Sequence, residues 1–265
     1  MSENSSPAIV QLSGLKIQRA DRVILQDVSF SIDPGQIVAI LGPSGCGKST
    51  LLATITGELC PDSGQIQVFG QDVPQSSRAL LQFRRNMGVL LQGNGLLTDL
   101  TVAENVALPL RAHTQLPEPI LQALVQLKLQ AVGLRGVADA LPRALSGGMA
   151  RRVALARALA LDPPLMLYDE PLTGLDPIAS GVIMTLIQRL NHSLGLTSII
   201  VTHHVRETLP MCNKAIVIAN QGVVFMGAPQ ELQHSQDPLV RQFLEGHPDG
   251  PIPFDARVHA ARAGE

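Results

Sequence analysis

Cysteine and aromatic residues are scarce in this chain of 265 residues, which has three cysteines, no tryptophan and one tyrosine. The cysteines are far apart and form no C-x-x-C pair, so we expect neither a zinc site nor a disulfide framework. Few aromatic side chains argue against the base-stacking surfaces that bind single-stranded nucleic acid. A net charge of −2 provides no electrostatic attraction to nucleic acid or to anionic lipid. We therefore expect no nucleic-acid partner.

Long apolar runs are lacking as well. Residues 1–8 are polar and contain no apolar segment of the kind found in signal peptides. The longest uncharged stretches, 190–205 and 215–230, are interrupted by His, Asn, Gly or Pro, and a membrane helix needs about 18 apolar residues. We expect a soluble protein that reaches a membrane by docking on another subunit.

The chain nevertheless has ample material for a core, since 45% of its residues are hydrophobic and 16% are charged. Alternating apolar and polar residues predict half-buried strands at 9–17 and 28–32. Short apolar runs predict buried strands at 37–41, 165–168, 198–201 and 215–218, with further strands at 65–69 and 87–91. Apolar residues recur at helical intervals over 102–162 and 183–194, which predicts helices there. Strands alternating with helices predict an α/β fold with a mainly parallel sheet and an inserted helical subdomain.

A glycine-rich segment follows the apolar run 37–41. It fits the phosphate-binding pattern G-x-x-x-x-G-K-[ST] in full, and the nucleotide-binding candidates are Gly42, Pro43, Ser44, Gly45, Cys46, Gly47, Lys48, Ser49 and Thr50. Glycines let backbone N–H groups approach phosphate oxygens, and the following helix directs its positive end at the same anion. Lys48 would reach the β- and γ-phosphates and Ser49 would bind Mg²⁺. A chance glycine turn is the alternative, but the preceding strand and following helix favour a nucleotide site.

Two acidic residues, Asp169 and Glu170, come directly after the apolar run 165–168. The end of a parallel strand would place them beside the phosphate loop. Asp169 would hold Mg²⁺, largely through water, and Glu170 would act as the general base for the attacking water. A solvated acidic loop is the alternative, which the apolar strand in a phosphate-loop protein disfavours.

Further motifs resemble those of the ABC ATPases, in the same order over about 240 residues. Leu145-Ser146-Gly147-Gly148-Met149 looks like the LSGGQ signature, and Gln92 looks like the Q-loop glutamine. Gly174-Leu175-Asp176 stands where the D-loop does, and His203 looks like the switch histidine. The resemblance implies an ABC nucleotide-binding domain over residues 1–245, with an N-terminal antiparallel β region, a helical subdomain at about 95–162 and a C-terminal extension over 246–265.

The resemblance also implies a mechanism that uses ATP and Mg²⁺. Ser146, Gly147 and Gly148 open a helix and would bind the γ-phosphate held by a second copy of the chain, in a head-to-tail homodimer. His203 would contact the γ-phosphate and orient the water with Glu170. Gln92 would sense Mg²⁺ and link the site to the helical subdomain, which in this family docks on an integral-membrane permease.

The sequence departs from the family pattern at three positions. Met149 replaces the signature glutamine, although the serine and glycines that bind phosphate remain. His204 stands where an aspartate often follows the switch histidine. The region near Ile17, where an aromatic ring commonly stacks on adenine, has no aromatic residue. Adenine would have to pack on an aliphatic or guanidinium surface, with Arg19 and Arg22 as candidates for the latter.

Five segments that, apart from Gly148, carry no candidate catalytic or binding residues make the resemblance more specific, because they look like those of the ATPases of the Mla systems. The segments are residues 110–117, 131–136, 148–152, 240–246 and 250–254. These systems move phospholipids between the inner and outer membranes and maintain outer-membrane lipid asymmetry. The resemblance implies a peripheral protein at the cytoplasmic face of the inner membrane, with a permease, a STAS-domain subunit and an MCE-domain lipid-binding protein as partners. It further implies that residues 246–254 hold the complex together.

Three other functions are alternatives to lipid transport. A DNA-repair or chromosome ATPase would carry a coiled coil or cysteine cluster between Lys48 and Asp169, and neither is present. A regulatory protein with two cassettes would need a second phosphate loop. An ABC importer of a different small solute stays open, because the permease partner decides the cargo.

Overall fold

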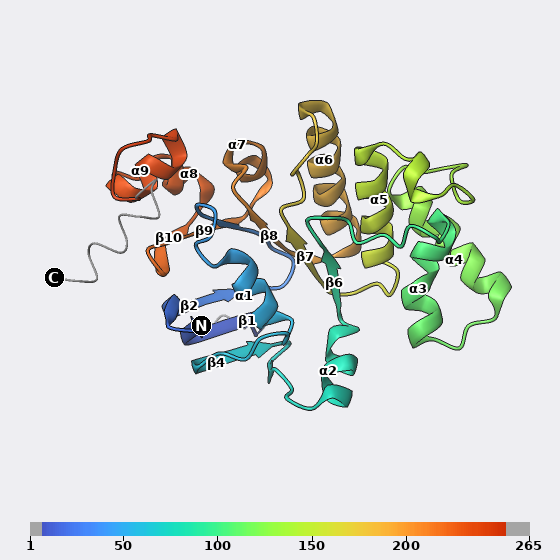
Figure 1. Ribbon diagram of the computed structural model, residues 1–265, viewed down its shortest axis with the longest axis horizontal. Coiled ribbons are helices and arrows are strands. Elements are labelled where there is room, and N and C mark those ends of the chain that lie inside the picture. Colours follow the sequence, from blue (N-terminus) through green and yellow to red (C-terminus); the bar gives the residue numbers. More distant parts are fainter. Residues whose placement is uncertain (1–6, 253–265) are drawn as a thin grey trace, which may run out of the picture.

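The computed structural model describes residues 7–252, which form two sheets with helices on either side of the larger one (Figure 1). The smaller sheet has the order β2-β1-β4-β5 and the larger β10-β9-β3-β8-β7-β6. This arrangement confirms the predicted α/β class. Among the described residues, no helix is both long and apolar enough to cross a membrane.

The smaller sheet is antiparallel throughout and contains β1 (Val10–Arg19), β2 (Arg22–Ile32), β4 (Ser63–Val68) and β5 (Gln71–Asp72). It confirms the N-terminal antiparallel region that the resemblance implied. Side chains along β1 alternate between buried and exposed positions, as a sheet with one solvated face requires.

The larger sheet contains β3 (Ile37–Leu41), β6 (Met87–Leu90), β7 (Leu165–Asp169), β8 (Thr197–Thr202), β9 (Lys214–Ala219) and β10 (Gly222–Gly227). Strands β9-β3-β8-β7-β6 are parallel, and β3 and β8 are wholly buried. Strand β10, which the sequence analysis missed, pairs antiparallel with β9 at the edge. Asn220 and Gln221 join them with positive φ angles of 46° and 69°, as a tight type I′ hairpin needs.

The two faces of the larger sheet bury different partners. On one face, α1 (Lys48–Ile55) packs between the two sheets through Leu51 and Ile55. On the other face, Met166 and Tyr168 contact α5 (Gly147–Ala158) and α6 (Pro177–Leu194) in one core. The α6 helix begins six residues before the predicted start, because Asp176 caps it and Pro177 occupies its first position.

The predicted helical middle consists of α3 (Val102–His113), α4 (Glu118–Ala131) and α5, which pack against one another at one end of the molecule (Figure 1). Shorter helices missed from the sequence are α2 (Ser77–Arg84), α7 (Val205–Thr208), α8 (Pro229–Gln233) and α9 (Pro238–Glu245). The proposed limits of the helical subdomain and of the C-terminal extension stay predictions.

The first residues of the predicted extension fold back on α9. The buried Gln242 side chain donates to the carbonyl of His247 at 3.2 Å and to that of Ile252 at 2.9 Å, and accepts from the Ile252 amide at 2.6 Å. Residues 253–265, which include the end of the predicted tie 246–254, lie outside the described residues.

Candidate nucleotide-hydrolysis site

The phosphate-loop residues follow β3 and lead into α1. Gly42, Gly45 and Gly47 have φ angles of 154°, 79° and 105°, and a Cβ on Gly42 would lie 2.1 Å from the carbonyl oxygen of Ile218. Glycine is therefore required at Gly42 for space, and at all three positions it suits the backbone conformation. The α1 helix starts after Gly47 without a side-chain cap and without an acidic residue in its first turn. Its first amide N–H groups have no partner within the helix and are suited to bind an anion.

Lys48 is 6% exposed, although it carries a charge. Its Nζ donates to the carbonyl oxygens of Gly42 at 2.8 Å and Pro43 at 2.9 Å. The loop therefore bends around its own lysine, with the ammonium against two of the loop's carbonyl groups. Charge and amides together form a site for a phosphate group.

Ser49 and Asp169 come together from α1 and the end of β7, as the sequence predicted for the acids and the phosphate loop. The Ser49 hydroxyl donates to Oδ1 of Asp169 at 3.2 Å. Burial raises the pKa of the Asp169 carboxyl, and the hydrogen bond from Ser49 opposes that rise. A hydroxyl and a carboxylate are hard oxygen ligands, so this pair fits Mg²⁺.

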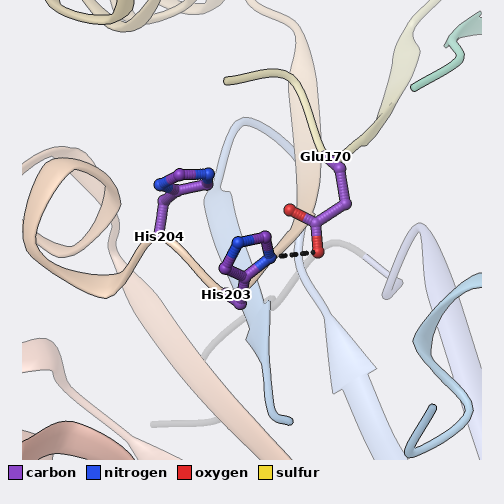
Figure 2. A group of neighbouring side chains, drawn as sticks. All are labelled: Glu170, His203 and His204. Carbon is purple, nitrogen blue, oxygen red and sulfur yellow. Dashed lines mark hydrogen bonds and ion pairs between the residues drawn. The ribbon is translucent and has the colours of Figure 1, made fainter. Parts of the chain in front are cut away.

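Glu170 follows β7 with a φ of 48°, a conformation uncommon outside glycine. Its amide donates to the carbonyl of Val201 on β8 at 2.9 Å. The carboxylate is fixed on both oxygens, since the Thr202 hydroxyl donates to Oε2 at 3.0 Å and Nδ1 of His203 lies 2.9 Å from Oε1 (Figure 2). The predicted base and the predicted switch histidine are therefore in direct contact. The sequence analysis did not identify Thr202 as a site residue. Its position at the end of a strand, directly before His203, was the signal that could have found it.

Gln92 comes just after β6 and is exposed. The order β3-β8-β7-β6 places the segments with Lys48, His203, Glu170 and Gln92 along one edge of the sheet. Ligand sites of parallel sheets lie at this edge. The structure thus brings the segments that carry these four motifs to the same edge of the sheet.

Arg151 on α5 anchors the Gln92 segment, a role that the sequence analysis did not predict. It is 3% exposed, and its Nη1 donates to the carbonyls of Leu91 at 2.9 Å and Gln92 at 2.8 Å. Its Nη2 donates to the carbonyl of Thr173 at 3.1 Å. Burial lowers the pKa of this guanidinium, which has no carboxylate within ion-pairing distance in the described part of the chain. One buried side chain therefore joins the signature helix to the segments around Gln92 and Thr173.

The signature residues lie at the start of α5. Ser146 caps this helix by accepting from the Met149 amide at 3.3 Å. Beside it, Asp176 caps α6. A cavity of about 240 Å³ is lined by Ser146, Gly147, Gly148 and the segment 174–176, together with neighbours on α5 and α6, and contains no residue of the phosphate loop. Within one chain, the signature and phosphate-loop residues therefore belong to separate sites.

The hairpin between β1 and β2 defines the expected adenine region. Ile17 is fully buried in the core, so it offers no surface to a base. Arg19 and Arg22 are exposed and pair across the hairpin. Ile24 borders the phosphate loop, since a Cβ on Gly47 would lie 3.0 Å from its Cγ2. The surface that could pack against adenine is therefore made of aliphatic and guanidinium groups.

Comparison with known proteins agrees with this geometry. A family model described as ABC transporter matches residues 25–173. The chain is 50% identical over 247 residues to the intermembrane phospholipid transport system ATP-binding protein MlaF of Haemophilus influenzae, covering 93% of this chain and 94% of the relative. It is 48% identical over 253 residues to the protein of the same name from Escherichia coli K12, covering 95% and 94%. The dimeric ATP-binding cassette MJ0796, bound to ADP and Pi, has a TM-score of 0.76 at 30% identity, covering 83% of this chain and 98% of that one.

Proposed function

Because the chain belongs to the ABC transporter family and is an ATPase of that family, we propose that its hydrolysis of ATP energises phospholipid transport between the inner and outer membranes, which maintains outer-membrane lipid asymmetry. The observation that carries the hydrolytic part is the contact of Glu170 with His203 beside the Ser49–Asp169 pair. The lipid cargo is supported by relatives that are about half identical over nearly the whole chain and carry phospholipid transport in their name. Both resemblances stated from the sequence, to the ABC ATPases and to the Mla ATPases, are confirmed.

The proposed roles follow from the positions of the side chains. Lys48 and the amides at the start of α1 bind the β- and γ-phosphates of ATP, and Ser49 and Asp169 hold Mg²⁺, with Gln92 approaching from the next strand. When bound, Mg²⁺ neutralises charge on the phosphate oxygens. Glu170 accepts a proton from the attacking water, and His203 orients that water and contacts the γ-phosphate.

We further propose that the active unit is a homodimer. Ser146, Gly147 and Gly148 stand at a helix start suited to an anion, in a cavity separate from the phosphate loop. A second copy placed head to tail would present these groups to the γ-phosphate held by Lys48. The dimeric structure of MJ0796, with ADP and Pi bound, supports the dimer.

The proposed setting is the cytoplasmic face of the inner membrane, where the helical subdomain docks on an integral-membrane permease. A STAS-domain subunit and an MCE-domain lipid-binding protein complete the proposed complex. An ABC importer of a different small solute is the alternative function, and the names of the two relatives favour the phospholipid.

The test is transfer of a fluorescent phospholipid in proteoliposomes that contain the full complex. We expect ATP-dependent transfer with the natural chain. Glu170→Gln should still bind ATP yet lower turnover by about 10²- to 10⁴-fold, because it cannot accept the proton. Lys48→Ala should weaken ATP binding or turnover severely. Robust hydrolysis by Glu170→Gln would overturn the base assignment, and a complex that hydrolyses ATP and moves a small solute but no phospholipid would overturn the cargo.

A further inference from the structure

A second histidine stands beside the proposed switch histidine. The rings of His203 and His204 have centroids 4.3 Å apart and planes tilted by 33°. Together with Glu170, each residue offers one ligand atom, and these atoms all lie within 4.8 Å of one another. Figure 2 shows the three side chains grouped beside the ends of two neighbouring strands, β7 and β8.

We propose that Glu170, His203 and His204 form an inhibitory site for a borderline-soft divalent cation, with Zn²⁺ as its representative. Two imidazole nitrogens and one carboxylate oxygen are a common three-ligand set for Zn²⁺, which leaves its fourth position open. Imidazole suits Zn²⁺, Cu²⁺ and Ni²⁺, whereas Mg²⁺ prefers oxygen. The site is therefore chemically distinct from the all-oxygen pair Ser49–Asp169.

The surrounding contacts orient the Glu170 carboxylate and hold the backbone of His204 in place. The Thr202 hydroxyl donates to the Glu170 carboxylate at 3.0 Å and accepts from the His204 amide at 3.0 Å. A hydrogen bond that orients a ligating carboxylate, as the bond from Thr202 does for Glu170, raises metal affinity. The side chain of His203 is 46% exposed and that of Glu170 12%, so an ion can enter from the His203 side. Two ligands on tetrahedral Zn²⁺ are roughly 3.4 Å apart, given bonds of about 2.1 Å. Since the three ligand atoms lie within 4.8 Å of one another, no pair has to close by more than about 1.4 Å.

The consequence for catalysis rests on the proposed function. A cation bound here occupies an oxygen of Glu170 and a nitrogen of His203, so neither group can serve the attacking water. His204 has no place in the proposed hydrolysis and contributes to the cation site alone. Substitution of His204 therefore separates metal inhibition from catalysis.

Binding is measured by isothermal titration of Zn²⁺ into the full, nucleotide-free chain. Every variant carries Cys60→Ser, because that exposed thiol could bind Zn²⁺ by itself. We expect one site per chain whose affinity falls at least tenfold in His204→Asn. The matched control is His192→Asn, an exposed histidine on α6, which should titrate as the parent does. Equal affinity in His204→Asn and the parent would overturn the site.

Inhibition is measured as ATP turnover at saturating Mg²⁺, with free Zn²⁺ fixed by a metal buffer and each variant compared with its own Zn²⁺-free rate. His204→Asn should need at least tenfold more Zn²⁺ for half inhibition. Inhibition at the same Zn²⁺ concentration in both proteins would overturn the proposal, and its relief when Mg²⁺ is raised further would place the ion at Ser49–Asp169. The titration measures binding and needs no hydrolysis. It therefore tests the cation site even if Glu170→Gln retains turnover and the proposed function is wrong.

Discussion

At the scale of single residues, Thr202 is the least expected part of the site, because its hydroxyl links the Glu170 carboxylate to the His204 amide. Thr202→Val removes both hydrogen bonds while keeping the branched shape. We expect turnover to fall about tenfold, equivalent to about 1.4 kcal/mol, since the proposed base loses its orientation. The KM for ATP should change little, because the two hydrogen bonds that are lost involve Glu170 and His204 and not the phosphate loop.

The control for this residue is Thr202→Ser, which keeps the hydroxyl and should restore most of the turnover. Steady-state kinetics on the three proteins separate turnover from KM. If the Val and Ser variants were equally active, Thr202 would act through packing, and its proposed positioning role would be excluded.

At the scale of elements, α5 connects segments that are distant in the sequence. Arg151→Met leaves the carbonyls of Leu91, Gln92 and Thr173 without their donor. We expect the free energy of unfolding to fall by about 2 kcal/mol, because buried carbonyls are costly to leave unpaired. Turnover should also fall, since the Gln92 segment loses its anchor. Urea titration measures the first effect and an ATPase assay the second.

Arg152 provides a matched control on the same helix. It is half-buried, and its Nη1 reaches the carbonyl of Gly133 at 3.2 Å and that of Val132 at 3.5 Å, within the helical middle. Arg152→Met should therefore lower the free energy of unfolding by less than Arg151→Met does. Equal losses in both variants would mean that α5 responds to the loss of any arginine.

At the scale of the whole molecule, the separation of signature and phosphate loop predicts catalysis in trans. Mixing a Lys48→Ala chain with a Ser146→Arg chain rebuilds one intact site per mixed dimer, because each supplies what the other lacks. Mixing a doubly substituted chain with the natural chain leaves no intact site in the mixed dimer. We expect ATPase activity in the first mixed dimer and little in the second.

This prediction needs mixed dimers isolated with two different affinity tags. Activity in the second mixed dimer and none in the first would mean that Ser146 serves the Lys48 of its own chain. The proposed head-to-tail arrangement would then be wrong.

The sequence by itself determined the features that depend on residues close along the chain. The phosphate loop, the acids 169–170 and the parallel strands were all readable, because glycine conformation, helix starts and apolar runs are local properties. Asp176-Pro177 and Asn220-Gln221 were local signals too, for the start of α6 and for the hairpin into β10. These two were available in the sequence and were overlooked.

Only the tertiary structure decided which groups meet. The Glu170 contacts with Thr202 and His203 depend on β7 pairing in register with β8, and the reach of Arg151 depends on how α5 packs beside β6. The full burial of Ile17 likewise depends on the core between the two sheets. Such contacts follow from the order of strands and the packing of helices, which involve residues far apart in the chain. No local pattern specifies them, because the same strands and helices would satisfy their own spacing rules in other arrangements.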